Sequence, residues 1–229
     1  MLILALETST ELGSCALWRD GSVLERFCPP GRSHSETLLP LVRELLAEAG
    51  TKVAALDGIA FGAGPGAFTG LRVACGAAQG LAAASDRLLL PVCSLEAMAL
   101  QAGNGPVIAL LDARMGEAYA ARYLCAGDDC RLVGEIRVLA PAAIELPEEA
   151  GWRACGNAAL AYPALAMRLQ ESGIALIDGI LPTAAAVARL AAPRLARGEG
   201  IDAAQAAPLY VRNKVAKTVA ERLEEGGRA

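Results

Sequence analysis

The residues of this sequence that could do chemistry gather first in Glu7-Thr8-Ser9-Thr10, where an acid precedes three hydroxyl side chains. Hydroxyl and backbone N–H groups at a turn can hold an oxyanion, and an acid beside them can handle water or Mg²⁺. The stretch ends a short apolar run that begins at residue 2, which we expect to form a buried strand. The pattern predicts a phosphate-holding turn at the end of that strand.

A glycine loop at residues 61–72 is the second chemical candidate. Gly62, Gly64 and Gly66 surround Pro65 between an apolar run and a run of small residues, an order typical of a strand, a loop and a helix. Free N–H groups at a helix N-terminus suit an anion, so Gly64 and Gly66 join the predicted phosphate or nucleotide site. A tight strand-to-helix connection without a ligand explains the glycines equally well.

Other catalytic groups are scarce. No glycine follows Glu7 until Gly13, and the turn 112–114 in the second half has neither glycine nor hydroxyl before Gly116, so we expect a vestigial phosphate site. The sequence contains no Walker loop. The single histidine, His34, excludes a metal site with two histidine ligands within one chain, and we expect it at an exposed helix start. We predict no catalytic residues, no metal site and no cofactor of the chain's own.

The composition limits the function further. The 229-residue chain is 54% hydrophobic and 20% charged, with a net charge of −4. It has only three lysines, so it lacks the clustered basic surface of a protein that binds nucleic acid by itself. A small basic cluster near the C-terminus is expected to be a solvated helix face; it consists of Arg212, Lys214, Lys217 and Arg222.

The seven cysteines also carry information about the compartment. They lie mostly within apolar runs and form no Cys-x-x-Cys pair, which is typical of a reducing cytosol and not of a disulfide framework. No basic segment precedes the apolar N-terminal run, so no signal peptide is expected. Charged residues interrupt every long apolar run, so no membrane span is expected. We predict a cytoplasmic protein.

Secondary structure is expected in the order βββαβαβα, twice, with a linker at 103–106. In the first unit, Asp20-Gly21 marks a hairpin, a Ser33/Glu36 capping box opens a helix, and Ser94 caps another. In the second unit, which is more weakly marked, Thr183 caps the last helix. We predict an α/β fold of duplicated units resembling the actin, Hsp70 and sugar-kinase (ASKHA) superfamily. The two domains are expected at 1–102 and 103–229.

One predicted helix, residues 69–84, has an unusual surface. Gly76, Gly80 and Ala84 recur every four residues and therefore share one face, although each interior glycine costs about 1 kcal/mol relative to alanine. Packing within its own domain would explain such a face, and so would docking of a second subunit. For docking, the apolar helix at 38–49 is expected to contribute as well. The predicted contact residues are Leu38, Leu41, Leu45, Arg72, Val73, Gly76 and Gly80.

Four stretches of the chain resemble the bacterial TsaB family, also called YeaZ. They are the start Leu-Ala-Leu-Glu-Thr-Ser-Thr, the run Ser33-His34-Ser35-Glu36, the loop Gly-Pro-Gly-Ala-Phe-Thr-Gly-Leu-Arg at 64–72, and Pro-Leu-Tyr-Val-Arg at 208–212. The similarity spans nearly the whole chain, and the loop is specific, unlike an isolated glycine-rich loop. The family usually begins with Asp-Thr-Ser-Thr, whereas Glu7 here is one methylene longer.

The resemblance implies a non-catalytic subunit. Proteins of this family pair with TsaD, which carries a metal site and transfers threonylcarbamoyl to N6 of adenosine 37 in tRNA. TsaE, an ATPase, joins the assembly. ATP and the metal ion are thus expected in the partner proteins, and tRNA is expected only through the complex. When it has no partner, such a chain is expected to form a homodimer through the same N-terminal helices.

Two other functions compete with this one. An ATP-dependent kinase or hydrolase of the same fold is the main alternative. An older label for such chains, M22 glycoprotease, gives a remote third, for which the sequence supplies neither a nucleophile nor a metal site.

Overall fold

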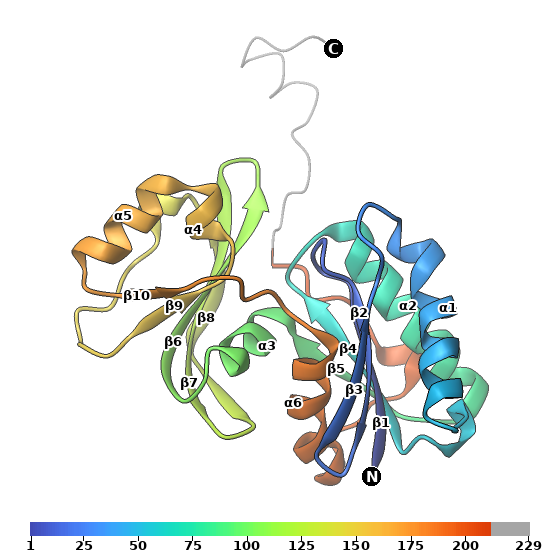
Figure 1. The fold of residues 1–229 in the computed structure, drawn as a ribbon. Helices are drawn as coiled ribbons and strands as arrows, with labels where there is room; N and C mark the ends of the chain where they lie inside the picture. The colour runs from blue at the N-terminus through green and yellow to red at the C-terminus, as the bar shows by residue number, and fades with distance from the viewer. Residues whose placement is uncertain (212–229) are drawn as a thin grey trace, which may run out of the picture.

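The structure is a computed structural model that describes residues 1–211. The predicted basic cluster at 212–222 lies outside the described residues. The chain forms two lobes, each built on a five-stranded sheet (Figure 1). Within residues 1–211, no helix is both long and apolar enough to cross a membrane.

The first sheet has the strand order β3-β2-β1-β4-β5. Its central strand β1 is apolar and buried along almost its whole length, because helices cover both of its faces. The hairpin at Asp20-Gly21 joins β2 and β3 as predicted, and β1 pairs antiparallel with β2 and parallel with β4. The elements are β1 (Leu2–Glu7), β2 (Ser14–Arg19), β3 (Ser22–Phe27), α1 (His34–Glu48), β4 (Gly58–Gly64), α2 (Phe68–Ser85), β5 (Leu89–Cys93) and α3 (Ser94–Gln101).

The second sheet repeats this plan with the strand order β10-β9-β6-β7-β8. The predicted order of elements is confirmed in both halves, although only a single 3-10 turn (Pro141–Ala143) stands where the first half has α1. The elements are β6 (Gly105–Arg114), β7 (Glu117–Ala126), β8 (Asp129–Leu139), β9 (Arg153–Cys155), α4 (Ala158–Ala161), α5 (Pro163–Glu171), β10 (Ala175–Ile177) and α6 (Ala184–Ala196).

Helices α3 and α6 exchange lobes and lie between the two sheets (Figure 1). Helix α3 packs on β6, β7 and β8, whereas α6 returns from the second half to pack on β1, β2, β4 and β5. The predicted cap of α6 is confirmed, because Thr183 accepts from Ala186 N. Side chains of the first sheet hold the same helix end: Ala184 N donates to Ser14 Oγ and Ala185 N donates to Glu25 Oε1, each over 2.8 Å. These contacts hold the start of α6 against the first sheet.

Three sequence predictions about local structure were wrong. Ser33 and Ser94 make no side-chain cap, because Ser33 Oγ pairs with Ser35 Oγ and Ser94 Oγ donates to Glu7. The expectation of reduced cysteines was also wrong for one pair, since Cys125 and Cys130 form a disulfide. The hairpin of β7 and β8 places these two residues directly opposite each other, with Cα atoms 4.1 Å apart.

Candidate functional site

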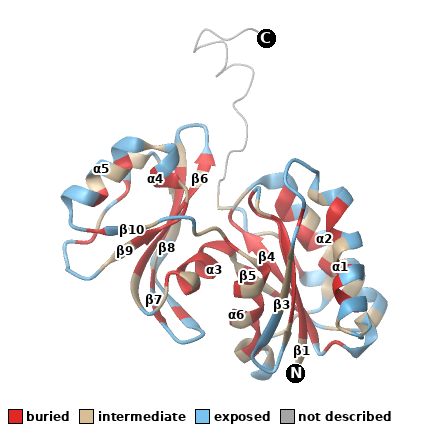
Figure 2. Cartoon of the chain, viewed as in Figure 1, coloured by how far each residue is buried: buried red, intermediate tan, exposed pale blue. Residues whose placement is uncertain are grey.

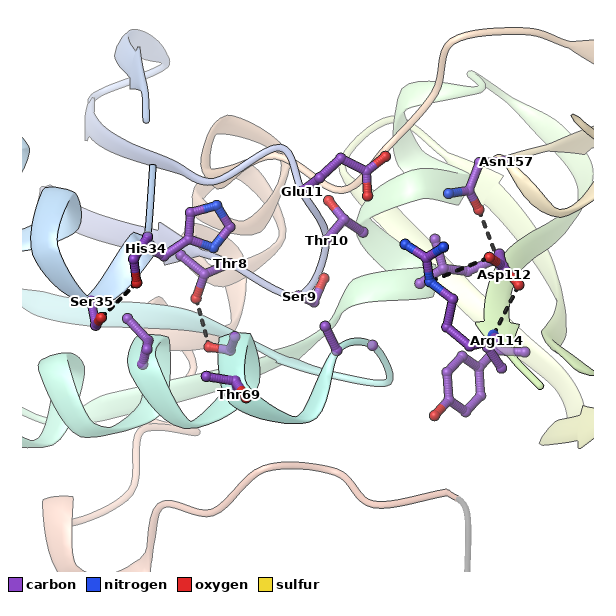
Figure 3. Close-up of a pocket in the computed structure, with 18 of the residues that line it drawn as sticks. Thr8, Ser9, Thr10, Glu11, His34, Ser35, Thr69, Asp112, Arg114 and Asn157 are labelled. Carbon is purple, nitrogen blue, oxygen red and sulfur yellow. Dashed lines mark hydrogen bonds and ion pairs between the residues drawn. The ribbon is translucent and has the colours of Figure 1, made fainter. Parts of the chain in front are cut away.

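A cleft of about 460 Å³ lies between the two lobes, where the ends of β1 and β6 face each other (Figure 3). Its first wall belongs to the N-terminal lobe and its second wall to the C-terminal lobe. Hydroxyl side chains dominate the first wall, and charged and amide groups dominate the second. The residues that line the two walls include Thr8, Ser9, Thr10, Glu11, His34, Gly66, Thr69, Gly70, Asp112, Arg114 and Asn157.

The predicted acid of the first turn does not reach this cleft. The Glu7 side chain is fully buried, where Ser9 N donates to Oε1 over 2.5 Å and Ser94 Oγ donates to Oε2 over 2.9 Å. Burial raises the pKa of Glu7 above its usual value, and the hydrogen bonds from Ser9 and Ser94 oppose that rise. Gly62 on β4 makes room for the carboxylate, because a Cβ there would overlap it. Glu7 therefore anchors the turn from inside.

The glycine loop seals the turn from the other side. A Cβ on Gly66 would overlap the backbone of Ser9, and one on Gly70 would overlap the carbonyl oxygen of Thr8. The closeness allows Ala67 N to donate to the Ser9 carbonyl over 2.7 Å, while Thr8 Oγ1 donates to the Gly70 carbonyl over 2.7 Å. The N–H group of Ala67, at the N-terminus of α2, thus binds a carbonyl of the same chain.

These contacts divide the predicted phosphate site. Thr8, Ser9, Thr10 and Gly66 line the cleft, but Glu7 and Gly64 do not, so the prediction was wrong for those two as ligand contacts. Gly66 and Gly70 of the loop pack directly against the backbone of the first turn. Ser9 Oγ, in the first wall, is buried and has no hydrogen-bond partner within residues 1–211.

The second turn presents its acid to the cleft. Asp112 Oδ1 accepts from Tyr162 Oη over 2.7 Å and from Arg114 N over 2.9 Å, and Asn157 Oδ1 accepts from Asp112 N over 2.8 Å. Arg114 Nε lies 3.6 Å from Asp112 Oδ2 (Figure 3). Arg114 and Met115 have left-handed backbones, with φ of 61° and 55°, which only a few per cent of residues other than glycine adopt. This turn holds its carboxylate at the wall of the cleft.

His34 lies closer to the cleft than predicted. It is only partly exposed and lines the first wall, and its ring packs so near Gly13 that a Cβ there would meet ring atoms at 2.7 Å. The strand β2 starts just after Gly13 and brings that glycine under the first turn of α1. Sequence spacing gave no sign of this contact.

The first turns of α1 and α2 line the cleft, and the rest of the two helices forms an outer surface of the first lobe (Figure 2). The prediction that Leu38 and Leu45 contact a partner was wrong, because both are buried against the sheet, with exposed fractions of 1% and 0%. Leu39, which lies on another side of α1, is 50% exposed. Periodicity identified the apolar face of α1 but assigned it to the wrong neighbour. Leu41 and Val73 are partly exposed.

The glycines of α2 do lie on its outer face. Gly76 and Gly80 are exposed, and a Cβ on either would meet no atom of the described chain within 4 Å. Packing within their own domain therefore does not explain them. At the N-terminal end of the same face, the guanidinium of Arg72 lies 3.9 Å from the ring centre of Phe68, and Arg72 Nε donates to Tyr210 Oη over 3.2 Å.

Sequence reasoning missed three residues that shape the site. Gly70 admits the Thr8 carbonyl, Ser94 binds the buried Glu7, and Tyr162 holds Asp112. Gly70 stands in the glycine loop and was available as a signal, whereas Ser94 and Tyr162 come from distant segments. Within residues 1–211, no group of three or more His, Cys, Asp or Glu side chains is arranged to hold a metal ion.

Comparison with known proteins identifies the family of this chain. A relative from Escherichia coli (strain K12), the tRNA threonylcarbamoyladenosine biosynthesis protein TsaB, is 37% identical over 94% of this chain and 96% of its own length. The chain belongs to the TsaB family. A second TsaB relative, from Haemophilus influenzae, is 34% identical over 94% of this chain and 95% of its own length. Residues 30–218 also match the family model described as TsaD, tRNA N6-adenosine threonylcarbamoyltransferase, so this TsaB-family chain belongs to that wider family too.

Solved structures agree. The structure of YeaZ from Pseudomonas aeruginosa has a TM-score of 0.81 and 41% identity, covering 91% of this chain and 99% of that one. Component A of (R)-2-hydroxyglutaryl-CoA dehydratase from Acidaminococcus fermentans has a TM-score of 0.51 at 10% identity, covering 86% of this chain and 99% of that one. The latter likeness concerns the fold only. The predicted TsaB resemblance and ASKHA-like fold are confirmed.

Proposed function

We propose that this TsaB-family chain is a non-catalytic subunit in the formation of N6-threonylcarbamoyladenosine in tRNA. It binds a TsaD-type transferase and supports its activity, together with TsaE. The names of its relatives and the match to the TsaD model support the pathway. One structural contrast supports the role: the acid of the first turn is buried behind its own chain, whereas the glycine face of α2 is open.

The open face has the properties of a docking surface. Bare glycines let the backbone of another helix approach closely, which increases the packing contact between two helices. Arg72, Phe68 and Tyr210 stand at one end of the face, and Leu39 is exposed on the neighbouring α1. Aromatic side chains and arginine are enriched where protein partners bind most strongly. In a free chain the same face supports a homodimer.

The residues of the cleft indicate which protein of the complex binds the nucleotide and the metal ion. The ASKHA fold implies a nucleotide with Mg²⁺ at the first turn, but Glu7 is enclosed and the N–H group of Ala67 is already bonded, so the residues do not fit it. We infer that ATP and the metal ion act in the partner proteins, in the cytoplasm. No tRNA contact by this chain itself is proposed, since its net charge is −4.

Reconstitution tests the proposal. A TsaD-type protein, TsaE, a threonylcarbamoyl-adenylate source and unmodified tRNA are incubated with and without the chain, and modified adenosine is measured. We expect modification only when the chain is present with TsaD, and none with the chain in the absence of TsaD. Full modification without the chain would refute a supporting role, and modification by the isolated chain would refute the non-catalytic role.

The alternative of an ATP-dependent kinase or hydrolase has one observation in its favour, the unpartnered Ser9 Oγ at the cleft wall. Titration calorimetry of the purified chain with ATP and Mg²⁺ separates the two functions. We expect no tight binding and no turnover. Tight binding with ATP hydrolysis would replace our proposal by the alternative.

A further inference from the structure

The two sheets differ in what covers their outer faces. In the first lobe, α1 lies along β2 and β3 and buries Leu38, Val42 and Leu45 against that sheet (Figure 1). The equivalent strands of the second lobe are β7 and β8. In residues 140–152, which join β8 to β9, the only helical segment is the 3-10 turn Pro141–Ala143, which packs on α5. The second sheet therefore has no counterpart of α1 on these two strands.

The side chains on this uncovered area come from both strands. Strand register places Arg122 opposite Val133 and Leu124 opposite Arg131, so each pair lies on one face. Tyr123, between them on β7, belongs to the core on the other face, which α3 covers. We call the uncovered area the β7–β8 face and define it as Arg122, Leu124, Arg131, Val133 and Arg137.

The arginines of the β7–β8 face are weakly engaged by their own chain. Within residues 1–211, Arg122 and Arg131 make no ion pair, and Arg137 Nη1 lies 3.8 Å from Glu145 Oε1, with both side chains at least half exposed. Arg122 lies across the bulge of β8, because a Cβ on Gly134 would be 3.8 Å from its Nη2. These guanidinium groups are therefore available to a partner.

Apolar surface lies beside the arginines. Leu124 is 38% exposed, and a hollow of about 170 Å³ adjoins the face, lined by the apolar side chains of Leu139 and Ile144 and by the acids Glu135 and Glu145. An antiparallel sheet that faces only water usually carries polar side chains on that face. Apolar side chains flanked by arginines are instead typical of a protein interface. Because the area has three arginines and two acids, its charge favours an acidic partner.

We propose that a helix of a protein partner covers the β7–β8 face, in the place that α1 takes in the first lobe. Its apolar stripe packs on Leu124 and Val133, and Asp or Glu side chains beside the stripe pair with Arg122 and Arg131. A nucleic acid matches this face less well, because phosphates would leave the apolar side chains uncovered. The inference rests on the proposed function in one respect: the partner is one of the proteins with which the chain assembles.

Assembly of the full-length chain with a TsaD-type protein and TsaE tests this inference. The dissociation constant of each protein is measured by biolayer interferometry for the native chain and for Arg131→Glu. We expect the constant of one protein to rise about tenfold, and to rise less at high salt because the lost contact is electrostatic. The matched control is Arg19→Glu, an exposed arginine on β2 of the first sheet, where both constants stay native.

A second pair of variants tests the apolar part of the face. Leu124→Ser should weaken binding of the same protein about fivefold at low and high salt alike, because the lost contact is apolar. Val23→Ser on β3 is the control, since that side chain is also 38% exposed but lies in the first lobe. Sedimentation velocity of the free chain and tRNA binding by the isolated chain are compared for the native chain and Arg131→Glu, and we expect neither to change.

Equal constants for both proteins in the native chain, Arg131→Glu and Leu124→Ser would overturn the inference and leave the proposed function intact. A change of self-association in Arg131→Glu would overturn it by making a second copy the occupant. Loss of tRNA binding in that variant would overturn it in favour of a nucleic acid. Failure of the native chain to assemble with either protein would refute the proposed function as well, and this result is distinguishable because it appears without any variant.

Discussion

The two turns that face each other across the cleft occupy equivalent places in the duplicated fold. They differ in how far their acidic side chains are buried. At the end of β1, Glu7 is fully buried and bonded to Ser9 N and Ser94 Oγ. Near the end of β6, Asp112 lies at the cleft wall with 12% of its side chain exposed, held by Tyr162. The acid of the first turn is therefore sealed inside its lobe, whereas the acid of the second turn is open to the cleft.

This difference shows how a fold can lose a chemical site and keep its architecture. The seal consists of close contacts that only glycine permits. Gly66 and Gly70 lie against the backbone of Ser9 and Thr8, and Gly62 lies against the Glu7 carboxylate. Once α2 packs this tightly on the first turn, the helix is fixed with its other face outward. The contacts that close the first turn thus also place Gly76 and Gly80 on the outward face of α2, where a partner can reach them.

The largest expected effect comes from breaking the seal. Gly70→Ala places a Cβ into the Thr8 carbonyl oxygen, and backbone must move to relieve the overlap. We expect a loss of about 3 kcal/mol or more in the free energy of unfolding. Gly76→Ala on the same helix is the matched control, where alanine meets nothing and should stabilise by about 0.5–1 kcal/mol. Urea denaturation gives the free energy of unfolding of both variants. Equal values would show that the contact of Gly70 with Thr8 does not hold the first turn.

The pH dependence of stability sharpens the contrast. Burial raises the pKa of Glu7 in the folded chain above the unfolded value of 4.5, so its favourable contribution is present below that value and is lost as the pH rises through the folded pKa. Glu7→Gln can still accept from Ser9 N and pair with Ser94, but it does not ionise. We expect the variant to lose less stability than the native chain between pH 4.5 and neutrality, measured by urea unfolding at several pH values. An unchanged pH slope would show that Glu7 is not the group responsible.

The smallest effect is expected at the open turn. Tyr162→Phe removes the hydroxyl that donates to Asp112 Oδ1 over 2.7 Å and should cost about 1 kcal/mol. Because the seal lies in the other lobe, the losses in Tyr162→Phe and Gly70→Ala should add in the double variant to within about 0.5 kcal/mol. A coupling well above that value, measured in the same urea experiment, would indicate that the two turns form one unit.

Sequence patterns predicted the order of elements because apolar periodicity and turn residues are local signals. They also predicted that Gly76 and Gly80 share a face of one helix. They could not reveal which neighbour a face would meet: Leu38 and Leu45 pack on the sheet, and Glu7 is covered by Ser94, which is 87 residues away. The Cys125–Cys130 disulfide depended on the register of β7 and β8, which composition does not determine.

We propose that the chain works through the outer face of α2 and not through the cleft. The most direct measurement is TsaD-dependent tRNA modification supported by two full-length variants, a Ser9→Ala/Thr10→Ala chain changed in the cleft and a Gly76→Leu/Gly80→Leu chain changed on α2. We predict that the cleft variant supports modification like the native chain, and that the α2 variant folds but supports little. Full support by the α2 variant, together with loss of support in the cleft variant, would show that the chain works through the cleft instead.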